Sequence, residues 1–131
     1  MMTGEIKSYD LDCSRVFVFE HYLINQIKDD VHVNLEHVEV LRNLINENYG
    51  SRKMVYISNR VNTYSVDPLV YPEVARIKNL IGMAIVTTTT RKKKNAMFEK
   101  IFFQKDFQVF ETFEESIIWA AGILSKIDFN E

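Results

Sequence analysis

The sequence predicts a single α/β domain over residues 1–131, with a mixed sheet of four to six strands, an N-terminal antiparallel hairpin, and β–α repeats whose helices pack on the sheet. Two observations support this fold class. Residues 15–20 and 22–28 both have strand character, and they follow one another too closely to leave room for a helix. In the second half of the chain, strand-like and helix-like stretches alternate, which is typical of parallel strands joined by right-handed crossovers.

The composition supports one folded domain. The chain has 131 residues, of which 47% are apolar and 26% are charged, as is ordinary for a soluble globular protein. Four glycines and two prolines are too few for a disordered chain or a loop-rich all-β fold. The net charge of -2 provides no overall positive field, so we expect no nucleic-acid partner.

Cysteine usage and hydropathy predict the compartment. Cys13 is the single cysteine, which excludes an internal disulfide and fits a reducing environment. No apolar run approaches the length of a membrane span, and the N-terminal residues lack the basic flank and apolar stretch of a signal peptide. We therefore expect a soluble, cytoplasmic protein with no membrane span.

The N-terminal part predicts a hairpin or a small meander. Residues 5–11 alternate weakly between apolar and polar and predict a first strand, and residues 12–14 predict a turn. In residues 15–20 valine and phenylalanine alternate, which predicts a strand with two apolar faces. Residues 22–28 predict its antiparallel partner.

A helix and a buried strand follow. Residues 34–49 predict a helix because Leu35, Val38, Leu41 and Ile45 recur at helical spacing. Asn34 is the predicted N-cap, and Gly50 is the predicted residue that ends the helix in a left-handed conformation. Residues 54–57 form a short apolar run without polar alternation, which suits a strand covered on both faces.

The next helix has an ambiguous start. Asp67 predicts an N-cap and Pro68 a first helical residue, since proline lacks a donor that would be unpaired there anyway. Pro72, about one turn later, deletes a further hydrogen-bond donor. Either residues 67–71 form a separate turn, or the helix begins near Pro72 and runs to Lys78.

Two strands and two helices complete the pattern. Residues 80–86 predict a buried strand in which Gly82 allows a close approach, residues 91–103 a helix, and residues 107–110 a short strand. Thr112 and Glu115 have the spacing of a capping box for a last helix that ends near residue 127. Its predicted inward residues are Phe113, Ile117, Ala120, Ala121 and Leu124.

The polar stretch 58–67 is the first candidate site. It follows the central strand, and open α/β sheets bind their ligands in loops at the carboxyl ends of strands. The candidate binding residues are Ser58, Asn59, Arg60, Asn62, Tyr64, Ser65 and Asp67. The alternative is that these side chains only hold a long loop in place.

The basic run 91–94 is the second candidate. Arg91, Lys92, Lys93 and Lys94 lie at a predicted helix start, where the helix dipole disfavours cations. Together with threonine hydroxyls and free backbone N–H groups they could hold an anion. An acidic protein surface, a phospholipid head group or a nucleotide phosphate would fit, and the alternative is a solvated loop.

Motifs for catalysis and metal binding are missing. The three histidines are far from Cys13 and lack ligand spacing, so we expect no metal site. Neither a nucleophile elbow, a Cys–His signature nor a glycine-rich phosphate loop occurs, so we assign no catalytic residue and expect no cofactor. An apolar pocket or plain core could be formed by Tyr64, Tyr71, Met83 and Met97.

Several stretches resemble a known family: residues 56–60, 62, 64–68, 81–86, 99–102 and 107–110. Over nearly the whole chain they resemble the STAS domain, also called the SpoIIAA-like fold of anti-sigma-factor antagonists. More narrowly, they look like STAS/SEC14-type proteins of Bacteroidetes. The resemblance implies a mixed sheet of four to five strands with helices, in a regulatory or protein-interaction module.

The chain departs from this family at the family's switch. In well-studied members, a partner kinase phosphorylates a serine at the N-terminus of the helix after the central strand, and the added charge changes partner affinity. The Asp-Ser-Ser-Gly type motif is absent here, and residues 58–60 and a longer loop take its place. Ser65 is the nearest substitute, so no kinase partner is carried over.

We therefore expect a non-catalytic regulatory or protein-interaction module whose contact surface is the polar loop 58–67 and whose partner is another protein. Arg60 would be the charged anchor of this surface. The alternative is a carrier of a small lipid-like or anionic ligand. A homodimer is a further option, because an uncovered edge of the N-terminal strands can pair with a second copy.

Overall fold

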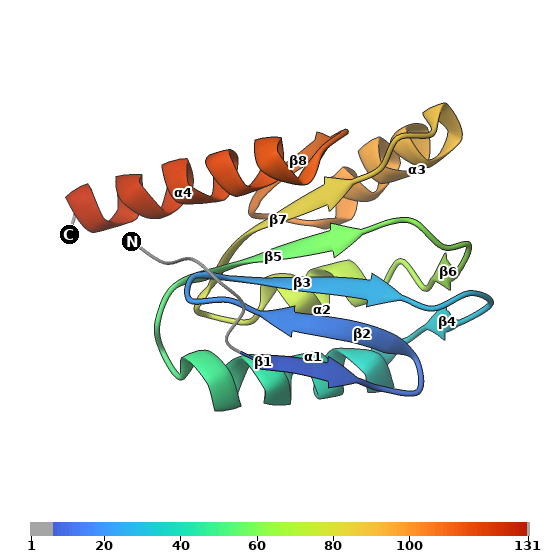
Figure 1. The fold of residues 1–131 in the computed structure, drawn as a ribbon, viewed down its shortest axis with the longest axis horizontal. Coiled ribbons are helices and arrows are strands. Elements are labelled where there is room, and N and C mark those ends of the chain that lie inside the picture. Colours follow the sequence, from blue (N-terminus) through green and yellow to red (C-terminus); the bar gives the residue numbers. More distant parts are fainter. Residues whose placement is uncertain (1–6, 131) are drawn as a thin grey trace.

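A six-stranded sheet forms the centre of the structure (Figure 1). The computed structural model describes residues 7–130, with side chains described up to residue 126. The strands are β1 (Lys7–Asp10), β2 (Ser14–Val18), β3 (Tyr22–Ile27), β5 (Met54–Asn59), β7 (Leu80–Val86) and β8 (Asp106–Phe110). In the order β1-β2-β3-β5-β7-β8, the first three are antiparallel neighbours and the last four are parallel. The predicted mixed α/β sheet with an N-terminal hairpin is confirmed.

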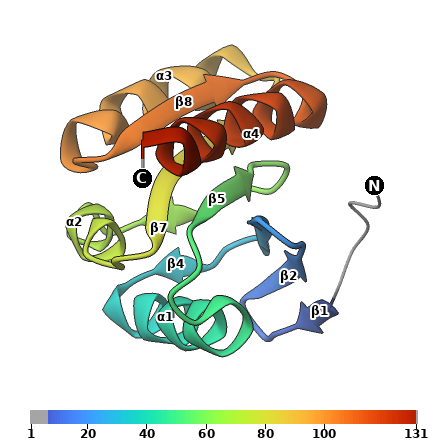
Figure 2. The same cartoon turned by 90° about the vertical axis from the view of Figure 1, so that its left-hand side faces the viewer.

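Helices cover both faces of this sheet. α1 (Leu35–Tyr49) and α2 (Val70–Ala75) pack on one face, and α4 (Phe113–Asn130) packs on the other over β5 and β7 (Figure 2). α3 (Thr90–Glu99) continues into a 3₁₀ turn, η1 (Lys100–Phe102), and contributes to the same core as α1 and α2. Within residues 7–130, no helix is long and apolar enough to cross a membrane.

The central strand β5 is buried on both faces, as its short apolar run predicts. Met54 and Tyr56 contribute to the core beneath α1 and α2, whereas Val55 and Ile57 contribute to the core beneath α4. This alternation follows from the two-residue period of a strand. β5 continues to Asn59, so its last two residues belong to the strand and not to the loop in which they were predicted.

The N-terminal strands differ slightly from their predicted bounds. β2 begins with Ser14, which was predicted to lie in a turn, and it ends two residues earlier than expected. The next turn begins at Phe19, whose backbone N–H donates to the carbonyl of Tyr22 (2.9 Å). Residues 5 and 6 of the first predicted strand lie outside the described residues. β1 forms one edge of the sheet, and pairing of this edge with a second copy stays a prediction.

A second, two-stranded sheet was not predicted. β4 (His32–Val33) pairs in parallel with β6 (Ser65–Val66), and β6 lies inside the stretch that was predicted to be all loop. Further backbone bonds extend the pairing: Asp30 N–H donates to the carbonyl of Thr63 (2.8 Å), and Ser65 N–H donates to the carbonyl of Val31 (3.0 Å). The loop after β5 is therefore fastened to the segment before α1.

The predicted cap residues of α1 are confirmed. Asn34 Oδ1 accepts from the backbone N–H of Glu36 (3.0 Å), and His37 Nδ1 accepts from the backbone N–H of Asn34 (2.9 Å). The helix ends at Gly50 as predicted, with a positive φ of 60° that favours glycine, but its ψ of -120° is not that of the predicted left-handed helical conformation.

The start of α2 matches neither alternative. Asp67 Oδ1 accepts from the backbone N–H of Leu69 (3.0 Å), so it closes a turn before the helix and does not cap the helix itself. The helix runs from Val70 to Ala75. Pro72 is its third residue, and the N–H groups of a first helical turn have no intrahelical acceptor, so the proline removes no helical bond.

The predicted close approach at Gly82 is confirmed. A Cβ there would lie 2.8 Å from Ile123 Cδ1, so α4 packs directly against β7.

The cap of α4 differs in one detail from the predicted capping box. Thr112 Oγ1 accepts from the backbone N–H of Glu115 (3.2 Å), and it also contacts the carboxylate of Glu115, so the glutamate reaches the hydroxyl of the cap and not its backbone. Ala121, predicted to face inward, is exposed, and among the α4 side chains described up to residue 126 those of Ser116, Ala120 and Ile123 are buried.

Candidate functional site

An open groove of about 460 Å³ lies where β5 and β7 end. One wall is formed by Arg60, residues 62–66, Pro68 and Tyr71, and the other by the inner side of α3 together with Phe102. The carboxyl ends of parallel strands are the usual place for ligand sites in α/β sheets. The volume is also within the usual range of about 300–1,000 Å³ for small-molecule pockets.

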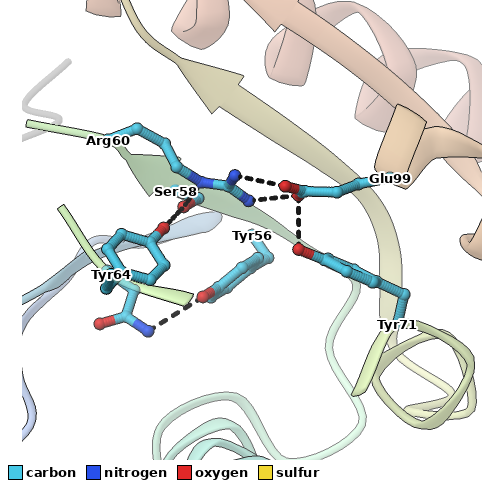
Figure 3. A network of polar contacts seen from close by, with 7 residues as sticks. Tyr56, Ser58, Arg60, Tyr64, Tyr71 and Glu99 are labelled. Atoms are coloured by element: carbon cyan, nitrogen blue, oxygen red, sulfur yellow. Dashed lines mark hydrogen bonds and ion pairs between the residues drawn. The ribbon is translucent and has the colours of Figure 1, made fainter. Parts of the chain in front are cut away.

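A buried ion pair forms the floor of the groove. Arg60 Nη1 and Nη2 donate to the two carboxylate oxygens of Glu99 at 2.9 and 2.7 Å (Figure 3). The side chain of Arg60 is 9% exposed and that of Glu99 is 16% exposed. This two-pronged geometry is the strongest form of the arginine–carboxylate contact, so it joins the loop after β5 firmly to α3.

Three further side chains complete the network around this pair. Tyr71 OH donates to Glu99 Oε1 (2.5 Å), and Arg60 Nε donates to Ser58 Oγ (3.1 Å). The guanidinium carbon of Arg60 lies 5.6 Å from the centre of the Tyr64 ring, at cation–π distance. Figure 3 shows that β5, the loop, α2 and α3 each contribute a group to this one network.

The network stabilises the charged form of Arg60 and the neutral forms of Tyr64 and Tyr71. Burial lowers the pKa of the Arg60 guanidinium, but Tyr64 and the bonds to Glu99 raise it by more, so its pKa lies above the ordinary value. Burial raises the pKa of the Tyr64 and Tyr71 hydroxyls, although the positive charge of Arg60 opposes this. At neutral pH the floor therefore holds a charged guanidinium and two neutral phenols.

Two of the predicted site residues lie beneath the groove. Ser58 is 2% exposed and Asn59 is 9% exposed, and both belong to β5. Asn59 Nδ2 donates to Gln26 Oε1 (2.9 Å) on the neighbouring strand. Both side chains form hydrogen bonds with other parts of the protein, and a direct role in binding stays a prediction.

The structure brings Arg60, Asn62, Tyr64 and Ser65 together at the groove. Asn62 Nδ2 donates to the carbonyl of Ile27 (2.9 Å), which holds the loop against β3. Ser65 is exposed, with its Oγ 2.7 Å from His32 Nδ1. Asp67 lies outside the groove, in the turn before α2.

The basic run occupies the first turns of α3, and only half of it faces the groove. Arg91 and Lys92 line the groove, whereas Lys93 pairs with Glu111 and Lys94 is exposed elsewhere. Lys92 Nζ donates to the carbonyls of Arg60 (3.3 Å) and Asn62 (3.1 Å), so it fastens the loop. Arg91 is exposed and makes no ion pair with another described residue, which leaves it as the accessible cation of the groove.

Sequence reasoning missed Glu99 as a site residue. The spacing of Glu99 from an apolar residue could have indicated that it faces inward. Glu99 lies three positions after Ala96, which is fully buried, so the two share one face of α3. Phe98 and Phe102 were also missed, and they line the groove as an aromatic pair with ring centres 5.8 Å apart.

A second, smaller cavity of about 60 Å³ lies beneath α1 and α2. Four residues border both hollows and form the partition between this inner cavity and the groove: Arg60, Tyr64, Val66 and Tyr71. Three of the four residues predicted to line an apolar pocket, Tyr64, Tyr71 and Met83, do line it. Met97 does not, because it is 53% exposed on α3.

The groups in the groove suit binding. The guanidinium of Arg91, the amide of Asn95 and the hydroxyl of Ser65 can donate hydrogen bonds, and the aromatic pair supplies an apolar surface beside them. An acidic group next to an apolar one would meet complementary chemistry here. Among residues 7–130, no three side chains of His, Cys, Asp or Glu come together as a possible metal site.

Comparison with known proteins gives one informative similarity. No protein-family model and no curated protein matches the sequence. The structure is similar to the crystal structure of an uncharacterized protein from the DUF3478 family with a SpoIIAA-like fold, from Shewanella loihica PV-4. The two share 14% sequence identity over 91% of this chain and 92% of that chain, with a TM-score of 0.53. At this identity the similarity confirms the expected fold, and the narrower resemblance to proteins of Bacteroidetes stays a prediction.

Proposed function

We propose that this chain, which has a SpoIIAA-like fold, is a non-catalytic regulatory module that binds an acidic segment of a partner protein in the groove. One observation carries the proposal. The groove joins the two candidate regions from the sequence, the polar loop and the basic run, in one hollow at the carboxyl ends of parallel strands.

The charge of the groove selects an acidic partner. Three cationic side chains and one carboxylate line it, which leaves two positive charges in excess in a chain whose net charge is -2. Arg60 and Glu99 neutralise one another, so the excess comes from Arg91 and Lys92. Complementary charge steers association and sets specificity, especially when the cation is accessible, as Arg91 is.

The aromatic pair supplies an anchor point. Phe98 is 62% exposed although it lines a concave surface, and Phe102 lies against it. Large apolar side chains exposed beside a polar rim are typical of surfaces that bind other proteins. We therefore expect the bound segment to carry an apolar side chain close to its acidic one.

The ion pair beneath the groove has a supporting role in this proposal. The sequence suggested Arg60 as the charged contact, but its guanidinium is already engaged by Glu99 and Ser58. We assign Arg60 to fixing the shape of the groove and Arg91 to contacting the partner. A groove that is held in shape before binding loses less entropy on association.

Selection from a random peptide library displayed on phage tests the proposal. We expect enrichment of peptides that combine Asp or Glu with an aromatic or large aliphatic residue. Arg91→Glu should lower the affinity of the protein for the selected peptides by about tenfold or more, because it reverses the accessible charge. Lys94→Glu is the matched control, since Lys94 lies on the same helix but does not line the groove. Enrichment without acidic residues, or equal losses in both variants, would refute the proposal.

A carrier of a small anionic or lipid-like ligand is the second candidate, favoured by the groove volume of about 460 Å³. Native mass spectrometry of protein purified gently from its own host tests it. A retained small mass that disappears in the Arg91→Glu variant would support the carrier. Protein that is empty, and that shows no thermal shift with phospholipids or nucleotides, would exclude it.

A further inference from the structure

Asn25 is a buried polar side chain whose amide is only half satisfied. It lies on β3, is 7% exposed and lines the inner cavity. Its Nδ2 donates to Tyr56 OH (2.9 Å), but its Oδ1 has no hydrogen-bond partner among the described residues. Exchanging the two amide atoms by rotation would only change which of them is unpaired. Since buried polar groups are nearly always paired in native proteins, this amide points to a bound molecule.

Tyr56 adds a donor next to this acceptor. Its hydroxyl accepts from Asn25, and its own proton is not donated to any described group. Burial raises the pKa of Tyr56 to about 12, so the phenol keeps that proton at neutral pH. With the amide in this orientation, the cavity presents one free acceptor and one free donor side by side. A ligand hydroxyl is both a donor and an acceptor, and it would satisfy both groups at once.

Most of the remaining wall of the cavity is apolar, which favours an organic molecule over water. A buried water needs about 10–15 Å³ and two to four polar partners. The cavity measures about 60 Å³, and most of its wall is apolar, with Val38, Leu41, Val74 and Met83 among the lining residues. One water could pair with Asn25, but waters in the apolar part of the cavity would lack partners. A single organic molecule can satisfy the amide and fill the apolar part together.

Charge and size restrict the ligand further. The one arginine of the wall, Arg60, is paired with Glu99, and His37 Nδ1 is engaged by the backbone of Asn34, so a charged ligand would find no free counter-charge. An apolar cavity of about 150 Å³ accommodates benzene, and this one is smaller. The half-buried Leu11 and the exposed Val40 lie in its wall, so it reaches the surface beside α1.

We propose that the inner cavity is a binding site for a short aliphatic alcohol or the hydroxyl-bearing end of a small neutral molecule, with Asn25 and Tyr56 as its recognition pair. This site is separate from the groove and does not depend on the proposed function. The hydroxyl donates to Asn25 Oδ1 and accepts from Tyr56, while its short carbon chain lies against the valines and leucines of α1 and α2.

Titration of the protein with 1-propanol, followed by methyl and amide NMR, tests this site. We expect saturable shifts confined to residues of the cavity. Asn25→Leu, which removes the amide at similar volume, should weaken binding by about tenfold. Tyr56→Phe should weaken it by a smaller factor. Thr87→Val is the matched control, because Thr87 Oγ1 is also buried and unpaired but lies outside the cavity, and it should leave binding unchanged.

Xenon binding provides a second measurement, because xenon fills apolar cavities without hydrogen bonds. Xenon uptake in the Asn25→Leu variant shows that the cavity persists, so that loss of propanol binding is then due to the lost amide. Shifts that rise linearly without saturation, or equal binding in wild type and Asn25→Leu, would overturn the proposal. A high-resolution structure with only waters at Asn25 in the presence of propanol would do so as well.

Discussion

Glu99→Gln removes the counter-charge of Arg60 while it keeps the shape of the side chain. The guanidinium donates to both carboxylate oxygens at 2.9 and 2.7 Å, and only 9% of the Arg60 side chain is exposed. The guanidinium stays charged after the substitution, because arginine is not deprotonated in proteins. The amide of the glutamine also turns a donor toward a cation that has only donors. The variant therefore buries an uncompensated positive charge.

The expected cost follows from this burial. Removing one partner of a buried ion pair typically costs about 3–5 kcal/mol of unfolding free energy. The glutamine oxygen can still accept from Tyr71 or Arg60, so we expect the lower end, about 3 kcal/mol. For a domain of this length, such a loss lowers Tm by about 10–15 °C.

Urea unfolding, followed by the fluorescence of Trp119, measures the loss. Glu73→Gln is the matched control: it is the same substitution, and Glu73 pairs with Arg76 at 3.0 Å and with Arg42 at 3.8 Å, whose side chains are 74% and 34% exposed. Exposed pairs of this kind are worth less than about 1 kcal/mol. If Glu99→Gln were no more destabilising than Glu73→Gln, the assignment of the pair as the fixed floor of the groove would be wrong.

Three further results are expected. Gly82→Ala should lower the unfolding free energy by about 1–3 kcal/mol, because the new Cβ would lie 2.8 Å from Ile123 Cδ1. Gly122→Ala should leave the unfolding free energy unchanged or raise it, because a Cβ there has nothing within 4 Å and alanine favours a helix. Thermal melts of the two variants, run in parallel, compare these effects. Asn34→Ala should cost about 1 kcal/mol in urea unfolding through loss of the α1 cap, and an unchanged midpoint would contradict that role. Burial raises the folded-state pKa of Tyr56 to about 12, so its contribution to stability is complete below the unfolded pKa of about 10 and is lost as pH rises toward 12. Urea midpoints across this range should fall less steeply in Tyr56→Phe, and identical slopes would contradict the raised pKa.

Long patterns in the sequence predicted the main elements of the fold. The apolar run of β7 was predicted with the bounds that it has in the structure, Leu80–Val86. β4 and β6 were not predicted because each has only two residues, too few to show a period. Ser58 and Asn59 looked like loop residues because they are polar. They are strand residues, since Arg60 and Gln26 satisfy their side chains inside the fold.

The candidate site could be located from the sequence but not assembled. The polar loop after β5 and the basic run were both recognised, and the groove joins them. The pairing of Arg60 with Glu99 spans 39 positions, and no local pattern reports a contact at that separation. Which residues of the basic run face the groove depends on how α3 is rotated about its axis. This rotation places Arg91 and Lys92 in the groove and leaves Lys94 outside it.

A charge swap across the groove tests the proposed function most directly. The measurement is the affinity of a selected acidic peptide, and of the same peptide with its acidic residue replaced by lysine, for wild type and Arg91→Glu. The account predicts that each single change weakens binding by about tenfold, and that the lysine peptide regains most of its affinity for Arg91→Glu. If the lysine peptide binds Arg91→Glu no more tightly than each single change allows, the acidic residue does not contact Arg91, and the groove is not where the partner binds.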